Sequence, residues 1–343
     1  RAVVVSPNPH HAAQGRCVTA EDYKIYAKKL FPQTQAVQVF GGESGSFDPT
    51  LGVTSTASYG RVFISIKSTT GNNLTSAQKA QLVKDFQKYN VASITPVIVD
   101  PDTVKLFLNV NFKFDSSKTI KEIDTLVSDV TTTLTNYNNS DLKSFNKVFR
   151  HSAVVGLIDD TNTAILSNIT NVILAKSITP TLDSSASHNI YFNNALYNPH
   201  SGHNSTAGGI LTSTGFKVSG DTTNEYFFDD DGQGNVRRYY LVGITRNYVD
   251  NIAGTINYST GAIVINGITI TAISNVDGVT STSIRFTVVP DSKDIIPVRN
   301  QILEIDFTNS KISGEVDTIA VSQPGAGGTY TTSSSYTSPS TGY

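Results

Sequence analysis

The stretch that decides the fold lies at residues 15–43 and reads GRCVTAEDYKIYAKKLFPQTQAVQVFGGE. Thr19 is a good helix N-cap, and Asp22 three residues later completes a capping-box-like pair. Pro32 ends the helix, and residues 36–40 follow as an apolar strand before a double glycine. One helix face carries Tyr23, Tyr26, Ala27 and Leu30. A capped helix and a strand without a nucleophile, a general base or a ligand cluster indicate a structural segment.

The composition bounds the class of protein. At 343 residues the chain can form two or three domains. Its formal net charge of -2 gives no global attraction to nucleic acid or membrane. Charged residues make up 16% of the chain, below the roughly 25% of ordinary soluble domains, and Ser, Thr and Asn take their place. Such surfaces are typical of proteins that pack against partners in an assembly.

Cysteine and methionine usage adds two expectations. The single cysteine, Cys17, excludes an internal disulfide framework and a multi-thiolate metal site. It lies beside a helix start, which can lower a thiol pKa, but we interpret it as a small apolar residue. No apolar run reaches the roughly 18 residues that span a bilayer, and no signal-peptide pattern opens the chain. Because the chain begins at Arg1 and lacks methionine, we expect a fragment or a processed product.

Helices and strands alternate through the first half of the chain. After a Gly/Ser/Pro-rich connector at residues 41–60, a strand is predicted at 61–66 and another at 94–99. Between them, Thr75 and Gln78 form a second capping box before an amphipathic helix.

The pattern then repeats with longer elements. Apolar and polar residues alternate along a predicted strand at 104–114, which gives the strand one apolar face. Thr119 and Glu122 then suggest a third capping box before a long helix. A shorter helix is expected from the cap Ser140 until about Gly156, and residues 163–178 close the unit as a strand. Helices packed on one face of small sheets predict an α+β fold with small mixed α/β domains.

The predicted secondary structure changes from about Ser187. Short predicted strands are separated by turns at Asp231-Gly232, Asn266-Gly267 and Asp277-Gly278, which indicates a β-rich domain without helices. The Gly/Ser/Thr/Tyr-rich stretch from Pro324 to Tyr343 cannot bury a core, so we expect it to order only against a partner. The predicted domains are a helix-strand segment with its connector, an α+β domain, a β-rich domain and a flexible tail, at residues 1–57, 58–186, 187–322 and 323–343.

Several of these stretches resemble a known family. RCVTAEDY at 16–23, GGE at 41–43 and GRVFISIK at 60–67 are similar to the corresponding motifs of Baseplate J-like proteins, which are structural components of contractile phage tails. The order of elements up to VKLFLNVNFKF at 104–114 and the following helices also fits, so the resemblance covers roughly the first 180 residues. The β-rich part, with YFFDDDGQGNVRRYYL at 226–241, resembles the C-terminal part of the larger wedge proteins of T-even-type phages.

The resemblance carries expectations about partners. It implies an inner-ring wedge subunit in the virion tail baseplate, assembled in the host cytoplasm, that associates with itself and with other wedge subunits and rearranges at infection. The wedge proteins would self-associate through one contact in each half of the chain. A chain holding only the C-terminal half is then expected to have one isologous patch and to form a homodimer. Neither nucleic acid nor membrane is expected as a partner.

The most tempting chemical site is DDDGQGN at 229–235, which suggests a calcium loop. Asp229 and Asp231 could fill the first and third positions of an EF-hand loop, and Gly234 the sixth. Tyr240, however, stands where a bidentate Glu is needed, and helices do not flank the loop. We therefore interpret the stretch as an acidic hairpin turn. On that interpretation, replacing Asp229, Asp230 and Asp231 by Asn costs about 1 kcal/mol per residue.

Other chemistry finds less support. A zinc site could be imagined at His200 and His203, with His188 nearby in the sequence. Zinc, however, requires a third or fourth ligand, and no cysteine or glutamate lies close by in the sequence. We interpret the pair His10-His11 as a chance feature. Loop histidines at a turn are the alternative that we favour.

Adjacent Asp159 and Asp160 would point to opposite faces of a strand, so we expect a turn or a cap instead of an acid-base pair. Nucleotide-binding and hydrolase motifs are missing from the sequence, and its basic residues are scattered. We predict no enzymatic activity, no catalytic residues, no cofactor and no metal.

The sequence thus favours a structural baseplate protein. The alternative is an adhesin-like tail protein that recognises a host glycan through the β-rich domain. A virion-borne glycan hydrolase, the third class, rests only on the acidic residues.

Overall fold

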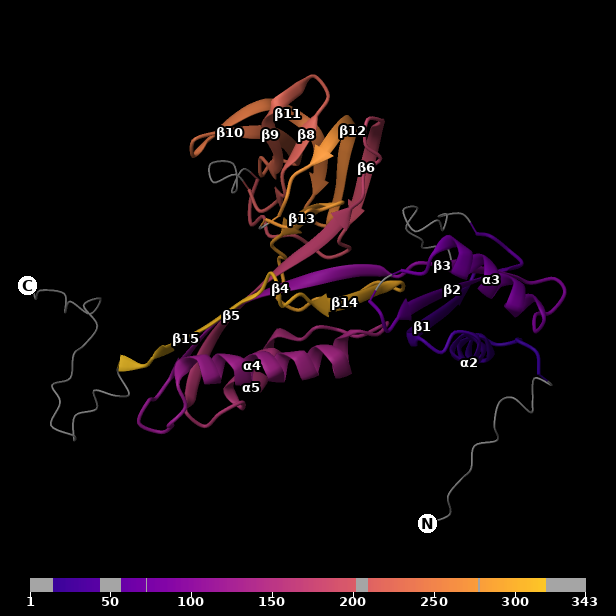
Figure 1. Ribbon diagram of the computed structural model, residues 1–343, viewed down its shortest axis with the longest axis horizontal. Helices are drawn as coiled ribbons and strands as arrows, with labels where there is room; N and C mark the ends of the chain where they lie inside the picture. Colours follow the sequence, from indigo (N-terminus) through magenta and orange to yellow (C-terminus); the bar gives the residue numbers. More distant parts are fainter. Residues whose placement is uncertain (1–14, 44–56, 72, 202–208, 277, 319–343) are drawn as a thin grey trace, which may run out of the picture. The chain divides into compact units, whose positions relative to one another are not determined.

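The computed structural model describes residues 15–43, 57–71, 73–201, 209–276 and 278–318 (Figure 1). The chain divides into two compact units, each assembled from separate segments. The larger unit holds residues up to Leu106, Asn139–Phe149 and Ile173–Glu304, and the smaller holds Phe107–Asn138, Arg150–Val172 and the residues from Ile305. The chain contains both helices and strands, with more strand than helix, which is compatible with the predicted α+β class.

The larger unit begins with a three-stranded sheet and two helices. The elements are α2 (Ala20–Leu30), β1 (Thr34–Gly41), β2 (Arg61–Ser68), α3 (Ser76–Gln87) and β3 (Thr95–Val99). The sheet order is β1-β2-β3, with β1 antiparallel and β3 parallel to β2. Both capping boxes are confirmed, Thr19 with Asp22 and Thr75 with Gln78. The helices bury one face against a core centred on Tyr23, Tyr26, Ile64, Ile66, Leu82 and Phe86.

Three strands and two helices form the smaller unit, although β4 and β5 each extend into the larger one. The elements are β4 (Asp102–Phe114), α4 (Ile123–Tyr137), α5 (His151–Asp159), β5 (Ile165–Ile178) and β15 (Lys311–Val316). The predicted alternation in β4 is confirmed, since Val104, Leu106, Leu108, Val110, Phe112 and Phe114 are all buried. β15 pairs in parallel with β4, and Figure 1 shows α4 and α5 next to each other.

Two helix predictions here were wrong. The third capping box does not form: α4 has Glu122 as its N-cap without a side-chain cap bond, and the Thr119 hydroxyl accepts from the Lys121 amide instead. The second helix does not begin at Ser140. A short π-helical turn spans Asn138–Leu142, Asn146 takes a left-handed φ of 62° that ends any helix, and α5 begins only at His151.

The β-rich region of the larger unit contains a closed sheet. Its strands are β6 (Ser185–Tyr191), β8 (Phe216–Val218), β9 (Asp221–Asp230), β10 (Asn235–Val242), β11 (Thr245–Asn257) and β12 (Ala262–Ile273). Their order is β11-β10-β9-β8-β12-β6, and an additional pairing of β11 with β12 closes the sheet into a barrel. From Ser185 to Val316 the described residues contain no helix, as predicted. The predicted turn at Asn266-Gly267 was wrong, because both residues lie in β12 at a bulge between Ile265 and Ile268.

The remaining strands belong to a third sheet. They are β7 (Thr212–Ser213), β13 (Ile284–Val288) and β14 (Gln301–Ile305), and the sheet order is β14-β4-β5-β13-β7. Asp277 and the stretch from Pro324 to Tyr343 lie outside the described residues.

Candidate functional site

The three consecutive aspartates lie where β9 meets the turn into β10. Asp229 and Asp230 are the last residues of β9, and only Asp231 belongs to the turn. The hairpin interpretation is therefore confirmed, but the first two aspartates are fully buried strand residues. Because strand side chains alternate, Asp229 and Asp230 point to opposite faces of the sheet.

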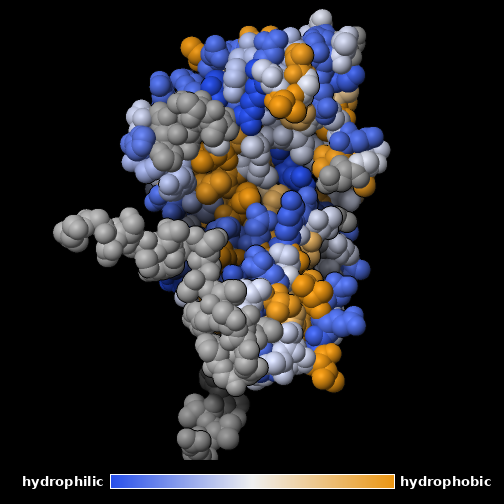
Figure 2. All heavy atoms as spheres, turned by 90° about the vertical axis from the view of Figure 1, so that its left-hand side faces the viewer, coloured by the Kyte–Doolittle hydropathy of each residue, from blue (hydrophilic) through white to orange (hydrophobic). Residues whose placement is uncertain are grey.

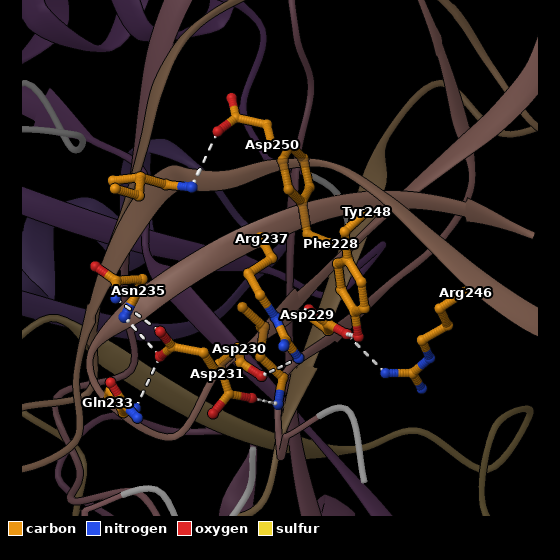
Figure 3. A network of polar contacts seen from close by, with 12 residues as sticks. Phe228, Asp229, Asp230, Asp231, Gln233, Asn235, Arg237, Arg246, Tyr248 and Asp250 are labelled. Atoms are coloured by element: carbon orange, nitrogen blue, oxygen red, sulfur yellow. Dashed lines mark hydrogen bonds and ion pairs between the residues drawn. The ribbon is translucent and has the colours of Figure 1, made fainter. Parts of the chain in front are cut away.

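Asp229 is held on the outer face by two arginines and a tyrosine (Figure 3). Its carboxylate accepts from Arg237 Nε at 2.9 Å, from Arg246 Nη1 at 2.7 Å and from the Tyr248 hydroxyl at 2.7 Å. Arg237 stands directly opposite Asp229 in the β9–β10 register and also stacks over the Tyr248 ring at 4.2 Å. Burial raises the pKa of Asp229, and the donors oppose that rise without reversing it.

Asp230 points into the barrel and ties a loop to it. One oxygen accepts from the backbone amides of Ile210 and Leu211 at 2.7 and 2.8 Å, and the other accepts from the Tyr258 hydroxyl at 2.6 Å. Burial, with this bond to Asp230, raises the pKa of Tyr258. Gly209 has to be glycine, because its φ is +70° and a Cβ there would lie 1.7 Å from the Asp230 carboxylate.

Asp231 stabilises its own turn. Its carboxylate accepts from the amides of Gln233 and Asn235 and from the Asn235 side chain, at 2.7 to 3.0 Å. The three carboxylates therefore face three separate sets of protein donors and do not converge on one point. The prediction that all three are turn residues was wrong for Asp229 and Asp230, because both are buried residues of β9.

The other candidates are dispersed among the described residues. His188 lies on β6 with its pKa lowered by burial, and His200 lies in a loop where its ring contacts the Ser201 carbonyl. Asp159 ends α5 and accepts from Asn168, and Asp160 is the C-cap, so the cap interpretation is confirmed for Asp160.

His203, His10 and His11 lie outside the described residues. Within the described ranges, groups of three or more His, Cys, Asp or Glu residues that could hold a metal are not found. Cys17 is buried, in accordance with its interpretation as a small apolar residue, and burial raises its pKa to about 12.

Sequence reasoning missed the partners of the aspartates. The sequence analysis did not single out Arg237, Arg246 or Tyr248, although a two-residue alternation along 226–230 and 235–242 places Arg237 and Asp229 on one face. Arg246 and Tyr248 come from β11, and only the barrel register brings them to Asp229.

A set of exposed aliphatic side chains, the hairpin patch, lies on β10 and β11. The two-residue loop holds Gly243 at a φ of 63° and Ile244, whose side chain is 99% exposed. The patch consists of Leu241, Val242, Ile244, Val249 and Ile252. On the face drawn in Figure 2, apolar groups are scattered among polar ones.

The comparisons with known proteins agree with this picture of a scaffold. Residues 19–99 match the family model of the baseplate structural protein gp6, C-terminal domain I, and residues 103–177 match that of its C-terminal domain III. Two consecutive stretches of this chain are thus similar to one phage baseplate protein. Baseplate wedge protein gp6 of Enterobacteria phage T4 is 25% identical over 166 residues, which are 48% of this chain and 23% of that protein.

A comparison with solved structures gives a weak match. The 6-fold symmetrised cryo-EM structure of the anti-feeding prophage baseplate aligns with 49% of this chain and 35% of its own, at 12% identity and a TM-score of 0.36, a likeness too weak to add to the argument. The gp6 matches show similarity to a structural component of a phage tail baseplate, and they do not favour a receptor-binding protein. In the described part of the chain, none of the helices has the length and apolar character needed to cross a bilayer.

Proposed function

We propose that the chain is a wedge subunit of a contractile-tail baseplate of the Baseplate J-like kind, acting through assembly contacts and a rearrangement at infection. The observation that carries the proposal is the tandem match of residues 19–99 and 103–177 to two C-terminal domain models of one baseplate protein. The matched stretch spans 23% of the T4 relative, so partners and movement are inferred for this chain. On this proposal the chain is neither an enzyme nor a metal protein.

The hairpin patch is the surface that we assign to self-association. β11 pairs with β10 along its length but with β12 only from Gly254 to Asn257, so residues 245–251 have one described strand neighbour. A free strand edge offers unpaired backbone donors and acceptors. When two copies of one edge pair antiparallel, a two-fold axis relates them, which makes the contact isologous.

A single isologous patch limits self-association to a dimer. A stable contact buries on the order of 1,600 Å² in total, and the hairpin patch with its neighbouring strand faces can contribute to it. One isologous patch stops at two copies, whereas a ring needs a second patch.

Light scattering over a range of protein concentrations tests the assignment. We expect a dimer for the parent chain and a monomer for Ile244→Asp, because burying a carboxylate in an apolar contact is unfavourable. Ile120→Asp is the matched control, since Ile120 is equally exposed but lies before α4. A monomeric parent refutes self-association, and a dimeric Ile244→Asp variant refutes the hairpin patch as its site.

Binding to other wedge subunits is tested separately. The chain, mixed with a lysate that contains tail components, should co-purify with baseplate proteins and not with host-cell glycans. Retention on host cells in place of tail components would contradict the wedge proposal.

A further inference from the structure

A polar hollow of about 540 Å³ opens in the larger unit beside the ends of β2, β3 and β5 and the start of β4. Ammonium and carboxylate groups dominate its wall. They belong to Lys67, Asp100, Asp102, Lys105 and Lys176. None of these residues takes part in the carboxylate network of the barrel or in the hairpin patch.

Three lysines surround a single carboxylate at this place. Glu304 on β14 lies 2.8 Å from Lys105 Nζ, 3.5 Å from Lys67 Nζ and 3.5 Å from Lys143 Nζ. The lysines come from β4, β2 and the segment after the π-helical turn, so the arrangement is a built feature of the fold. These positive charges hold the pKa of Glu304 below its usual range, although burial acts in the opposite direction.

The other carboxylates of the hollow are already paired. Asp100 binds Lys79 at 2.6 Å, and Asp102 binds Lys176 at 2.6 Å while also accepting from Gln301. Lys79, Lys143 and Glu304 do not line the hollow but form ion pairs with this cluster, and with them the cluster holds three carboxylates and five ammonium groups. Two positive charges are left without a balancing negative charge.

Lys67 is the buried ammonium group with the weakest contacts in this cluster. Its side chain is only 5% exposed, and its two contacts, to Glu304 and to the Gly71 carbonyl, are both long at 3.5 Å. Burial lowers the pKa of Lys67, and Lys105 and Lys143 lower it further because they are like charges. A buried ammonium group with weak partners and like-charged neighbours is stabilised by an added anion.

We propose that this hollow binds an oxyanion group carrying about two negative charges, next to Lys67 and Lys105. The same chemistry has two sources, which are a free phosphate and a pair of carboxylates on an acidic segment of a partner protein. The inference rests on the charges and the cavity alone and does not depend on the wedge proposal.

Isothermal titration calorimetry in a low-salt Hepes buffer at pH 7.5 tests the site, with inorganic phosphate and an acetylated, amidated Gly-Glu-Glu-Gly peptide as separate probes. We expect saturable one-to-one binding of at least one probe. Lys67→Met, which keeps the chain length and removes the charge, should weaken it by roughly tenfold or more. Lys311→Gln, at an exposed lysine of β15, is the control and should bind like the parent.

A variant with the opposite sign separates binding from simple damage. Glu304→Gln raises the local excess of positive charge, so it should bind the same probe more tightly than the parent, provided that circular dichroism shows a folded chain. Binding of phosphate alone identifies a free anion, and binding of the peptide alone identifies an acidic segment. Absence of binding by both probes, or equal losses in Lys67→Met and Lys311→Gln, overturns the proposal.

Discussion

Asp229 and Asp230 are equally buried neighbours on β9, yet their amide substitutions should differ in cost. The difference comes from the donors that each carboxylate meets. Asp230 faces two backbone amides on one oxygen and the Tyr258 hydroxyl on the other. In Asp230→Asn, the amide oxygen can accept from the backbone, and the amide nitrogen can donate to a hydroxyl that has reversed its role. We expect a loss of about 1 kcal/mol in the free energy of unfolding.

In Asp229→Asn, the donors cannot all reverse their roles in this way. Two of the three donors around Asp229 belong to guanidinium groups, which cannot accept a hydrogen bond. One guanidinium group must then face the new amide nitrogen with its donor unpaired. Such a group costs roughly 1.5–3 kcal/mol, and Arg246, whose side chain is 31% exposed, recovers part of this from water. Since burial also raises the pKa of Asp229, the lost charge adds little. We expect a total of about 2 kcal/mol.

Urea unfolding followed by near-ultraviolet circular dichroism is suited to the comparison, because the chain lacks tryptophan and this barrel is rich in tyrosine. Amide hydrogen exchange read by mass spectrometry then assigns the loss to β9, β10 and β11. Asp231→Asn serves as a turn control and should cost about 1 kcal/mol or less. If Asp230→Asn proves as destabilising as Asp229→Asn, or more so, the argument from donor roles is wrong.

Three further predictions concern other parts of the fold. Hydrogen bonds from the Asn224 backbone amide, the Tyr226 hydroxyl and other donors lower the pKa of Asp221 below its usual value. The ionised carboxylate therefore stabilises the fold above about pH 4, and this effect is lost as the pH falls further. In an acid titration, the free energy of unfolding of Asp221→Asn should depend less on pH than that of the parent chain. Gly254→Ala places a Cβ 2.2 Å from a backbone oxygen of β12 and should lower the melting temperature strongly, whereas Gly267→Ala meets only ordinary contacts and should not, as thermal scans can show. With its pKa raised to about 12, Cys17 should resist a thiol-specific disulfide reagent at pH 8 until urea unfolds the chain, and rapid labelling of the native protein would contradict its burial.

Local signals were sufficient for much of the first half of the fold. Capping boxes at Thr19 and Thr75 carry their own hydrogen bonds, so the sequence alone locates α2 and α3. The alternation of β4 survives because one face is buried and a slip of one residue would expose it. In each of these cases neighbours in sequence supply the stabilising contacts.

Predictions became wrong where distant residues decide the structure. The Asn138 side chain bonds to the backbone of Ile305, 167 positions away, close to Ser140, where the second helix was expected to begin. Asn266-Gly267 looks like a turn, but β6 and β11 hold the flanking residues in one strand. Likewise, the burial of Asp229 depends on Arg246 and Tyr248, whose positions only the closed barrel determines.

The parallel pairing of β15 with β4 has a consequence for how the chain is made. Ser313 bonds to the Val110 carbonyl, 203 positions earlier, so β4 must await a strand that leaves the ribosome after the whole barrel. At the usual rates of synthesis this delay is roughly 10 to 40 s. During that interval one edge of β4 lacks its neighbour and can pair with another nascent chain. Slower initiation or fewer ribosomes per message should therefore raise the soluble yield, and chains cut before Lys311 should aggregate.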